Sequence, residues 1–439
     1  MPLHMAGTEV YVHTLASFQK AAGHEVAILT PFFSYYPNRQ FNEHYVYDGI
    51  DVYQYMEVSN PKSKDIASGK KLTDGLNEFE KKIKSLNPEI IHFHELTRSI
   101  GLSIHHVKKA KDSGAKVVLT MHLSGYTCNT NTLINHNKLC SGKILEFDCS
   151  VCSYKTLFNL PALIAPPIAT TGLFLKYTGI IKKMPPNKLT TLLSIPSTIN
   201  RIKNELVVLE NNVDKFISLT EWYKKILLVN GVAKNKIIVI PQGLAVTNIA
   251  KKNNKPSYLP IKIVFIGRIQ SQKGVDLLIN ALKGFSPNEV ILDIYGKPED
   301  TDYYRQCVES GVSKSFINFK GAIERTEVLN VLTAYDILCL PSTFSEMSPL
   351  VIQEAFAAGI PVLASNVYGN AEQIQHGANG WLFSFKNKEA LEKQVAELIK
   401  QPELIDAAKK NVPTPNTFDV LTRAYDELYN EIVSTAKAN

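Results

Sequence analysis

The sequence predicts an α/β protein with two doubly wound domains, and two observations lead to this prediction. Short apolar runs alternate with segments of helical period through both halves of the chain, which is typical of βαβ units and parallel sheets. A polar stretch with two prolines, 245–260, separates the halves. With 439 residues, 45% of them apolar, the chain can bury two cores. We therefore expect a ligand cleft between the carboxyl ends of two sheets.

Apolar runs in the first half predict parallel strands. They lie at 26–30, 90–94, 117–121, 216–219 and 237–240. Helical spacing predicts helices between them at 9–22, 76–86 and 221–230.

The same rhythm continues in the second half. Strands are expected at 261–266, 290–295, 317–319, 337–340 and 361–364, and helices at 274–282, 327–334, 351–358, 388–398 and 418–433. The expected domains are 1–247, with an insertion at 128–200, then 260–415, and a C-terminal helix in 416–439 that packs back on the N-terminal domain.

Charge excludes a nucleic-acid-binding surface. Lys and Arg number 48 against 41 Asp and Glu, a formal charge of +7, but the basic residues are scattered, without runs or interleaved aromatic residues. We expect no nucleic-acid partner.

Two motifs in the second half carry chemistry. A buried strand ends at Gly267, and Arg268 and Lys273 precede the next helix, where a guanidinium fork and an ammonium suit a diphosphate. Two solvated loop cations are the equally weighted alternative. Glu346 and Glu354, eight residues apart, could hold hydroxyls of two sugars, or else cap and decorate a helix.

Taken together, these motifs resemble the family 4 retaining glycosyltransferases (glycosyl transferases group 1) of GT-B fold. The resemblance rests on Gly267-Arg268, Lys273-Gly274, the Glu346/Glu354 pair, 355–365 and 368–383, and in the first half on 5–31 and 218–243. It thins over 128–200. It implies two Rossmann-like domains and a hexosyltransferase of polysaccharide biosynthesis, which moves a sugar from a nucleotide-diphosphate donor to a glycan or lipid-linked acceptor.

The resemblance also implies roles for individual residues. Arg268 and Lys273 would neutralise the departing diphosphate, Glu346 would hold hydroxyls of the transferred sugar, and Glu354 would hold the ribose. His122 matches the family's N-domain histidine near the donor sugar.

Backbone groups complete the implied donor site. They belong to Gly7, Gly267, Ser348, Pro349 and Leu350. The family needs no metal or other cofactor for catalysis, so the protein's contribution is charge neutralisation and positioning. Without the family, a lone strand-end histidine such as His122 is more often structural, and His92 and His94 are interpreted in that way.

Two departures from the family pattern stand out. Residues 368–372 read YGNAE where many members carry Gly-Gly and Pro-Glu, so no phosphate role is assigned to them. An apolar first strand precedes the family's glycine loop, whereas here Met1 starts almost at that loop. We expect the first strand of the N-terminal domain to be missing, and the start to be internal to a longer reading frame.

Residues 156–175 form a run of uncharged residues interrupted by prolines. Its length reaches that of a membrane span, but the prolines favour a pair of short buried or interfacial helices. Peripheral membrane contact through 157–175 is the alternative, which would place a cytoplasmic protein at the inner face of the membrane.

Four cysteines crowd into a short part of the chain: Cys128, Cys140, Cys149 and Cys152. With His136 nearby they could hold a structural zinc, although the spacing also fits ordinary reduced thiols. Cys307 and Cys339 are interpreted as core residues.

Two other functions remain open. A nucleotide-sugar epimerase would share the fold, but the insertion at 128–200 argues against it. A non-catalytic or truncated GT-B protein would be explained by the missing strand.

Overall fold

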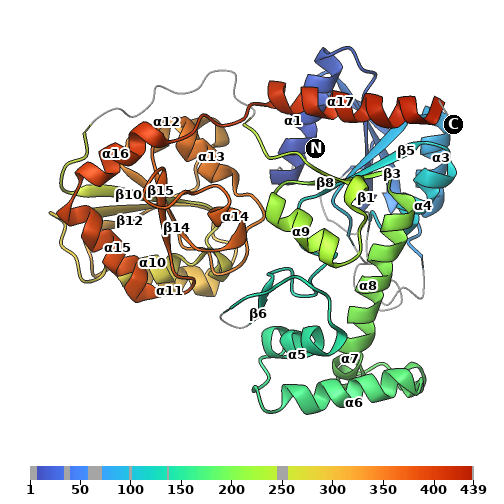
Figure 1. Cartoon of the computed structure of the whole chain (residues 1–439), viewed down its shortest axis with the longest axis horizontal. Helices are drawn as coiled ribbons and strands as arrows, with labels where there is room; N and C mark the ends of the chain where they lie inside the picture. Colours follow the sequence, from blue (N-terminus) through green and yellow to red (C-terminus); the bar gives the residue numbers. More distant parts are fainter. Residues whose placement is uncertain are drawn as a thin grey trace. The chain divides into compact units, whose positions relative to one another are not determined.

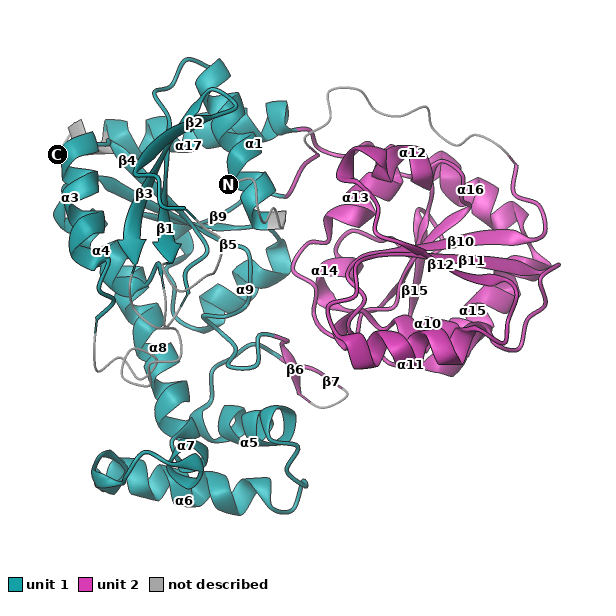
Figure 2. Ribbon diagram, turned by 180° about the vertical axis from the view of Figure 1, so that it is seen from behind, with its two compact units in different colours: residues 1–131, 141–241, 418–439 teal, residues 132–140, 242–417 magenta. Residues whose placement is uncertain are grey.

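The computed structural model describes residues 7–33, 40–57, 72–97, 101–135, 138–244 and 256–437. They form two compact units (Figure 2). Unit 1 comprises 1–131, 141–241 and 418–439, and unit 2 comprises 132–140 and 242–417. Unit 1 therefore includes 418–439, unlike the expected N-terminal domain, 1–247, and lacks its residues 242–247 and its short segment 132–140. That segment holds the hairpin β6 (Ile134–Asn135) and β7 (Lys138–Leu139).

Unit 1 contains two main sheets (Figure 1). The parallel sheet has the order β4-β5-β8-β9, with β4 at Ile90–His94, β5 at Lys116–Met121, β8 at Lys215–Ser218 and β9 at Ile237–Val239. The other has the order β1-β3-β2, with β1 at Ala27–Phe33, β3 at Ile50–Glu57 and β2 at His44–Tyr47. β1 and β3 are parallel, and β2 runs antiparallel to β3.

β1 and β4 are both edge strands. Among the described residues no strand pairs with both of them, and residues 1–6 lie outside that part of the chain. The edge position agrees with the burial of β4, where only Phe93 is fully enclosed.

Helices cover the sheets of unit 1. They are α1 (Gly7–Ala21), α3 (Leu76–Leu86), α4 (Ile104–Asp112), α8 (Ile195–Asn212), α9 (Glu221–Val229) and α17 (Phe418–Lys437). The predicted C-terminal helix is confirmed, because Leu421, Tyr425, Leu428 and Ile432 recur at helical spacing. They pack with Tyr11 and Leu15 of α1 over Val118 and Ile217 of the parallel sheet.

A helical subdomain occupies the insertion of unit 1. It consists of α5 (Glu146–Leu157), α6 (Ala165–Tyr177), a 3-10 turn at Ile180–Lys183 and α7 (Lys188–Leu193). Pro166 and Pro167 stand at the start of α6, where a missing N–H costs nothing. The uncharged run 156–175 therefore contains the last residues of α5, the connection that follows and most of α6. No described helix combines the length and apolar character needed to cross a bilayer.

Unit 2 is one six-stranded parallel sheet of order β12-β11-β10-β13-β14-β15. The strands are β10 (Ile261–Ile266), β11 (Val290–Tyr295), β12 (Ile317–Gly321), β13 (Ile337–Leu340), β14 (Val362–Ser365) and β15 (Gly380–Phe383). β15 was not predicted.

Helices cover both faces of this sheet. They are α10 (Val275–Leu282), α11 (Thr301–Gly311), α12 (Val328–Leu332), α13 (Leu350–Ala357), α14 (Tyr368–Ala371), α15 (Lys388–Lys400) and α16 (Glu403–Asn411). Each face has its own apolar core, one under α10 and α15 and one under α12 and α13. The doubly wound prediction is thereby confirmed for unit 2.

Candidate functional site

The topology of unit 2 marks one point for ligand binding. The chain winds from β10 outward to β11 and β12, then returns to β13 on the other side of β10. In open α/β sheets, ligands bind at the carboxyl ends of the strands where the order reverses. The loops that follow β10 and β13 are therefore the candidate site, and they carry the predicted Arg268, Lys273 and Glu346.

Two glycines let these loops and a neighbour pack closely. Gly274 has φ +69°, and a Cβ there would stand 2.1 Å from the Pro341 carbonyl oxygen in the loop after β13. Gly267 lies beside Gly296, where a Cβ would stand 1.8 Å from the Gly267 oxygen. Only glycine allows these backbone approaches. The packing of Gly274 brings Lys273 against the loop that carries Glu346.

Lys273 and Glu346 form the centre of the site. The Lys273 Nζ lies 2.7 Å from the Glu346 Oε1, and both side chains are largely buried, with exposed fractions of 16% and 7%. The Ser342 hydroxyl donates to the same oxygen at 2.7 Å. The Lys273 ammonium also lies 5.2 Å from the centre of the Phe344 ring. A buried carboxylate held by a cation and a hydroxyl is preorganised to accept further hydrogen bonds.

Arg268 is the exposed member of the predicted set. Its Nη1 lies 3.1 Å from both carboxylate oxygens of Glu299, in the loop after β11. Both side chains are exposed, at 60% and 41%, so the pair is weak and can open for another anion.

Glu354 stands in α13, as predicted. Burial raises the pKa of its carboxyl above the ordinary value, and the charge of Arg325 opposes that effect. The helix begins after Pro349, which provides no side-chain cap, so the backbone from Ser348 to Leu350 forms an uncapped helix N-terminus.

The YGNAE segment has a structural role in this region. It opens α14, and a Cβ on Gly369 would stand 2.2 Å from the Glu346 carbonyl oxygen. The Ser345 N–H donates to the Thr132 carbonyl at 3.0 Å, and the Tyr368 hydroxyl donates to the Cys140 carbonyl at 2.9 Å. Segment 132–140 and α14 therefore both support the Glu346 loop, which the sequence alone did not indicate.

His122 lies in unit 1, directly after β5. It is buried, and burial lowers the pKa of its imidazole to about 4. Its Nε2 lies 3.3 Å from the Nδ1 of His94. Since both rings are neutral at pH 7, one nitrogen donates and the other accepts, so His94 and His122 determine each other's tautomer.

Glu95 holds the backbone of His122 and was missed in the sequence. Its Oε2 accepts from the N–H groups of His122 and Leu123 at 2.9 and 2.7 Å. Glu95 has φ +64°, a left-handed conformation that costs a non-glycine residue about 1 kcal/mol or more. A carboxylate immediately after a predicted strand was the available signal.

The other strand histidine has a different environment. His92 contacts the Tyr429 hydroxyl through Nδ1 at 2.6 Å and the Thr120 hydroxyl through Nε2 at 2.7 Å. Burial lowers the pKa of His92 to about 3. These partners support the structural interpretation of His92, whereas His94 touches the candidate residue His122.

Gly7 and the four clustered cysteines are the remaining predicted site residues. Gly7 is the first residue of α1. Among the described residues no three His, Cys, Asp or Glu side chains gather as a metal site. Cys128, Cys149 and Cys152 belong to unit 1 and Cys140 to unit 2, while His136 is outside the described residues. The zinc site stays a prediction.

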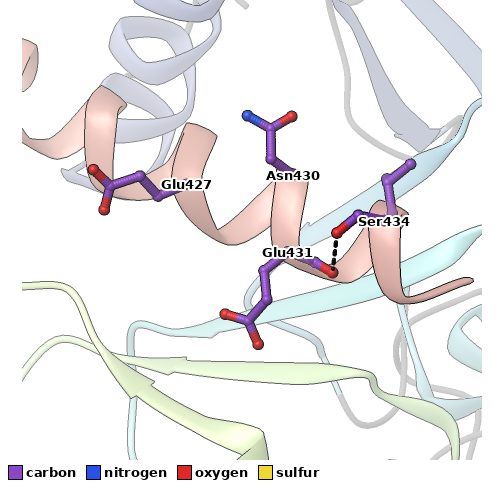
Figure 3. A pocket seen from close by; sticks show the side chains of 5 residues that line it. Glu427, Asn430, Glu431 and Ser434 are labelled. Carbon is purple, nitrogen blue, oxygen red and sulfur yellow. Dashed lines mark hydrogen bonds between the residues drawn. The ribbon is translucent and has the colours of Figure 1, made fainter. Parts of the chain in front are cut away.

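A surface hollow on α17 lies apart from all of these residues in sequence (Figure 3). It is lined by Glu427, Asn430, Glu431, Val433 and Ser434, and the Ser434 hydroxyl donates to the backbone of Glu431. Its lining comes from consecutive turns of one helix, and no predicted site residue contributes to it.

Two family models match the chain in the expected order. Glycosyltransferase Family 4 matches residues 5–140, and Glycosyl transferases group 1 matches residues 246–414. The chain belongs to the group 1 and family 4 glycosyltransferases. The resemblance found in the sequence is confirmed, and the region 141–245 lies outside both matches.

Individual relatives are distant. A putative colanic acid biosynthesis glycosyltransferase of Salmonella typhimurium is 24% identical over 243 residues, covering 53% of this chain and 59% of that protein. The chain spans about half the length, or less, of the curated relatives it matches first.

Solved structures agree with the GT-B fold. Sucrose-phosphate synthase from Thermosynechococcus elongatus has a TM-score of 0.62 at 16% identity, with 98% of this chain and 94% of that chain covered. Anabaena HepE, in complex with UDP and glucose, has a TM-score of 0.55 at 13% identity, covering 87% and 86%.

Proposed function

We propose that this glycosyltransferase moves a sugar, with retention, from a nucleotide-diphosphate donor to a glycan or lipid-linked acceptor. The Lys273, Glu346 and Ser342 cluster at the reversal point of the unit 2 sheet carries the proposal. The family models and the UDP bound to Anabaena HepE support a nucleotide-sugar donor. The name of the Salmonella relative supports a place in polysaccharide biosynthesis.

Charge neutralisation is the main contribution proposed for unit 2. Arg268 leaves Glu299 and, with Lys273, stabilises the diphosphate as its bond to the sugar breaks. Glu346 accepts from hydroxyls of the sugar, and Glu354 accepts from the ribose. The N-terminus of α13 and the turn at Gly267 face the phosphates.

Acceptor attack completes the proposed reaction. The acceptor hydroxyl bonds to the sugar carbon on the face that the diphosphate leaves, and its proton passes to the departing phosphate. His122 lies near the transferred sugar in this proposal, where it contacts a hydroxyl or helps to place the acceptor, and the backbone of Gly7 faces the donor phosphates and sugar. No metal or other cofactor is needed for catalysis in this proposal, which predicts unchanged turnover after chelator treatment.

A donor panel tests the proposal. Binding and turnover are measured with UDP-, GDP- and ADP-sugars, with and without candidate acceptors. Transfer to an acceptor supports the proposal. Interconversion of the donor without an acceptor would instead indicate an epimerase. Failure of every donor to bind would favour the non-catalytic alternative.

The proposal extends to the protein's location and to a structural zinc site. We infer a cytoplasmic protein that is peripheral at the inner face of the membrane. Metal analysis before and after chelation tests a structural zinc at the four cysteines, and the lack of stoichiometric metal before chelation would reject it.

A further inference from the structure

The outward face of α6 is unusually apolar. The residues that α6 turns toward the protein are small, namely Ala165, Ala169 and Gly172. A Cβ on Gly172 would stand 2.7 Å from the Leu193 carbonyl oxygen, so the backbones approach closely there. Two aromatic residues of α6 are exposed instead, Phe174 at 62% and Tyr177 at 73%, and the Tyr177 hydroxyl donates to Glu146 at 2.9 Å. The other large apolar residues of the helix are half-buried. This arrangement is the reverse of an ordinary surface helix.

Further exposed apolar residues flank α6 in the sequence on both sides. Leu163, before α6, is 89% exposed, and Ile180, after it, is 44% exposed. Figures 1 and 2 both place α6 at the outer edge of unit 1, beyond α5 and α7. Several large apolar side chains exposed on and beside one helix favour a contact with a partner or a membrane.

Charge selects between those partners. No Asp or Glu occurs from 149 to 204, whereas seven Lys and Arg do. Lys182, Lys183 and Lys188, which closely follow Ile180, are exposed. Lys176 is already paired with Glu146. A second copy docking through the same face would bring these lysines toward one another, which disfavours a two-fold dimer. An anionic surface would instead attract all of these lysines.

We propose that the face formed by Leu163, Phe174, Tyr177 and Ile180, bordered by Lys182 and Lys183, docks on an anionic lipid bilayer. The apolar side chains enter the boundary between headgroups and acyl chains, and the lysines meet lipid phosphates. This inference deepens the proposed function, on which it rests, because it brings the enzyme to a lipid-linked acceptor.

Vesicle flotation of the full chain tests the inference. The probes are vesicles of pure phosphatidylcholine and vesicles of phosphatidylcholine with phosphatidylglycerol. We expect binding to the anionic vesicles only, weakened by salt. Lys182→Gln with Lys183→Gln should reduce the partition constant about fivefold per lysine. The control pair Lys81→Gln and Lys84→Gln removes equal charge from α3, and should bind as the wild type does.

The apolar contribution needs its own variants. Leu163→Asp with Phe174→Asp should abolish flotation, whereas Val312→Asp, at a 75% exposed position of unit 2, should not. Equal binding by all variants, or no binding to anionic vesicles, would overturn the inference. So would a wild-type dimer that Phe174→Asp converts to monomer. Donor binding is measured on the same samples: its loss in the wild type would reject the proposed function, whereas its presence without flotation would reject only the docking.

Discussion

A single carboxylate, that of Glu95, holds the backbone that follows β5 and does so from a strained conformation of its own backbone. Glu95 accepts from the N–H groups of His122 and Leu123, the first two residues after β5, and its own φ is +64°. Such strain persists where the surrounding contacts over-determine it, and often marks a functional site. Glu95 therefore fixes the backbone of His122, while His94 fixes its imidazole.

Substitution of Glu95 separates strain from hydrogen bonding. Glu95→Ala should cost about 2–3 kcal/mol of stability, because two backbone donors lose a charged acceptor. Glu95→Gly loses the same bonds but relieves the left-handed strain, so it should be about 1 kcal/mol more stable than Glu95→Ala. Urea unfolding measures both. Transfer rates should fall in both variants while donor affinity is retained. Equal stability of wild type and Glu95→Ala would contradict this role.

Glu354 is a second residue whose environment opposes its charge. Its raised folded-state pKa means that the folded protein holds this proton more tightly than the unfolded chain does. The contribution of Glu354 to stability is therefore greatest at low pH and is lost as the pH rises through the folded pKa. Glu354→Gln, which is always neutral, should therefore raise the melting temperature at pH 7.5 but weaken donor binding.

The melting temperature at low pH provides the control for Glu354→Gln. The difference in melting temperature between Glu354→Gln and the wild type should shrink as the pH falls and the wild-type carboxyl becomes protonated. A variant that binds donor normally would refute the proposed ribose contact, and one that is less stable at pH 7.5 would refute the burial cost.

Adjacent strands of unit 1 place several buried histidines close together. His92 and His94 of β4 and His122 after β5 all have lowered pKa values, chiefly because burial disfavours the charged ring. A lowered folded pKa contributes stability that is present above the unfolded value, about 6.5, and is lost as the pH falls toward the folded value.

Acid unfolding tests this cluster. The free energy of unfolding should decrease below about pH 6.5, by about 1.4 kcal/mol per pH unit for each buried histidine. His92→Phe should reduce the slope of unfolding free energy against pH between about pH 6 and pH 5 by the contribution of one histidine. Urea titrations at several pH values measure it. An unchanged slope in that variant would mean that His92 charges equally easily in the folded and unfolded chain.

Two loops of unit 2 depend on a single glycine for their contact. Gly274 has a left-handed backbone conformation, and a Cβ added there would stand 2.1 Å from the Pro341 carbonyl oxygen. Gly321 is also left-handed, at φ +78°, but a Cβ there meets nothing within 4 Å. The two positions thus share the conformational demand, and only one has the close approach.

Matched alanine substitutions separate these effects. Gly321→Ala should cost about 1–2 kcal/mol of stability from the left-handed conformation alone. Gly274→Ala should cost more, because the loops must also move apart, and it should weaken donor binding at least tenfold by displacing Lys273 from Glu346. Thermal unfolding and donor titration measure the two quantities. Equal effects at both positions would mean that the loop contact is unimportant for the site.

For the whole molecule, much of the fold could be predicted from sequence periodicity. The strands at β10 and β11 and the helix α3 have their predicted bounds, because buried parallel strands and amphipathic helices leave regular apolar patterns. β2 and β3 were missed, since the half-buried antiparallel pair carries many polar residues. The grouping of 132–140 with unit 2 was also missed, because contacts between segments far apart in the sequence leave no pattern in the local sequence.

The candidate site was predicted unevenly for a similar reason. Lys273 and Glu346 were found through motif order, and the structure pairs them. Sequence spacing does not specify which side chains meet across loops, so the contacts of Ser342, Glu299 and Glu95 were not predicted. It also does not specify the positive φ of Glu95.

Neutralisation of a donor diphosphate by the unit 2 loops is the main step proposed for this enzyme. Its most direct test is the single-turnover rate of a cognate nucleotide-sugar with Arg268→Ala, compared with Arg305→Ala, a control at another exposed arginine with a carboxylate partner. Loss of one preorganised electrostatic contact of about 2–4 kcal/mol predicts a rate roughly 30- to 1,000-fold lower for Arg268→Ala. The Arg305→Ala rate should equal that of the wild type. A wild-type rate for Arg268→Ala would mean that Arg268 does not stabilise the departing diphosphate.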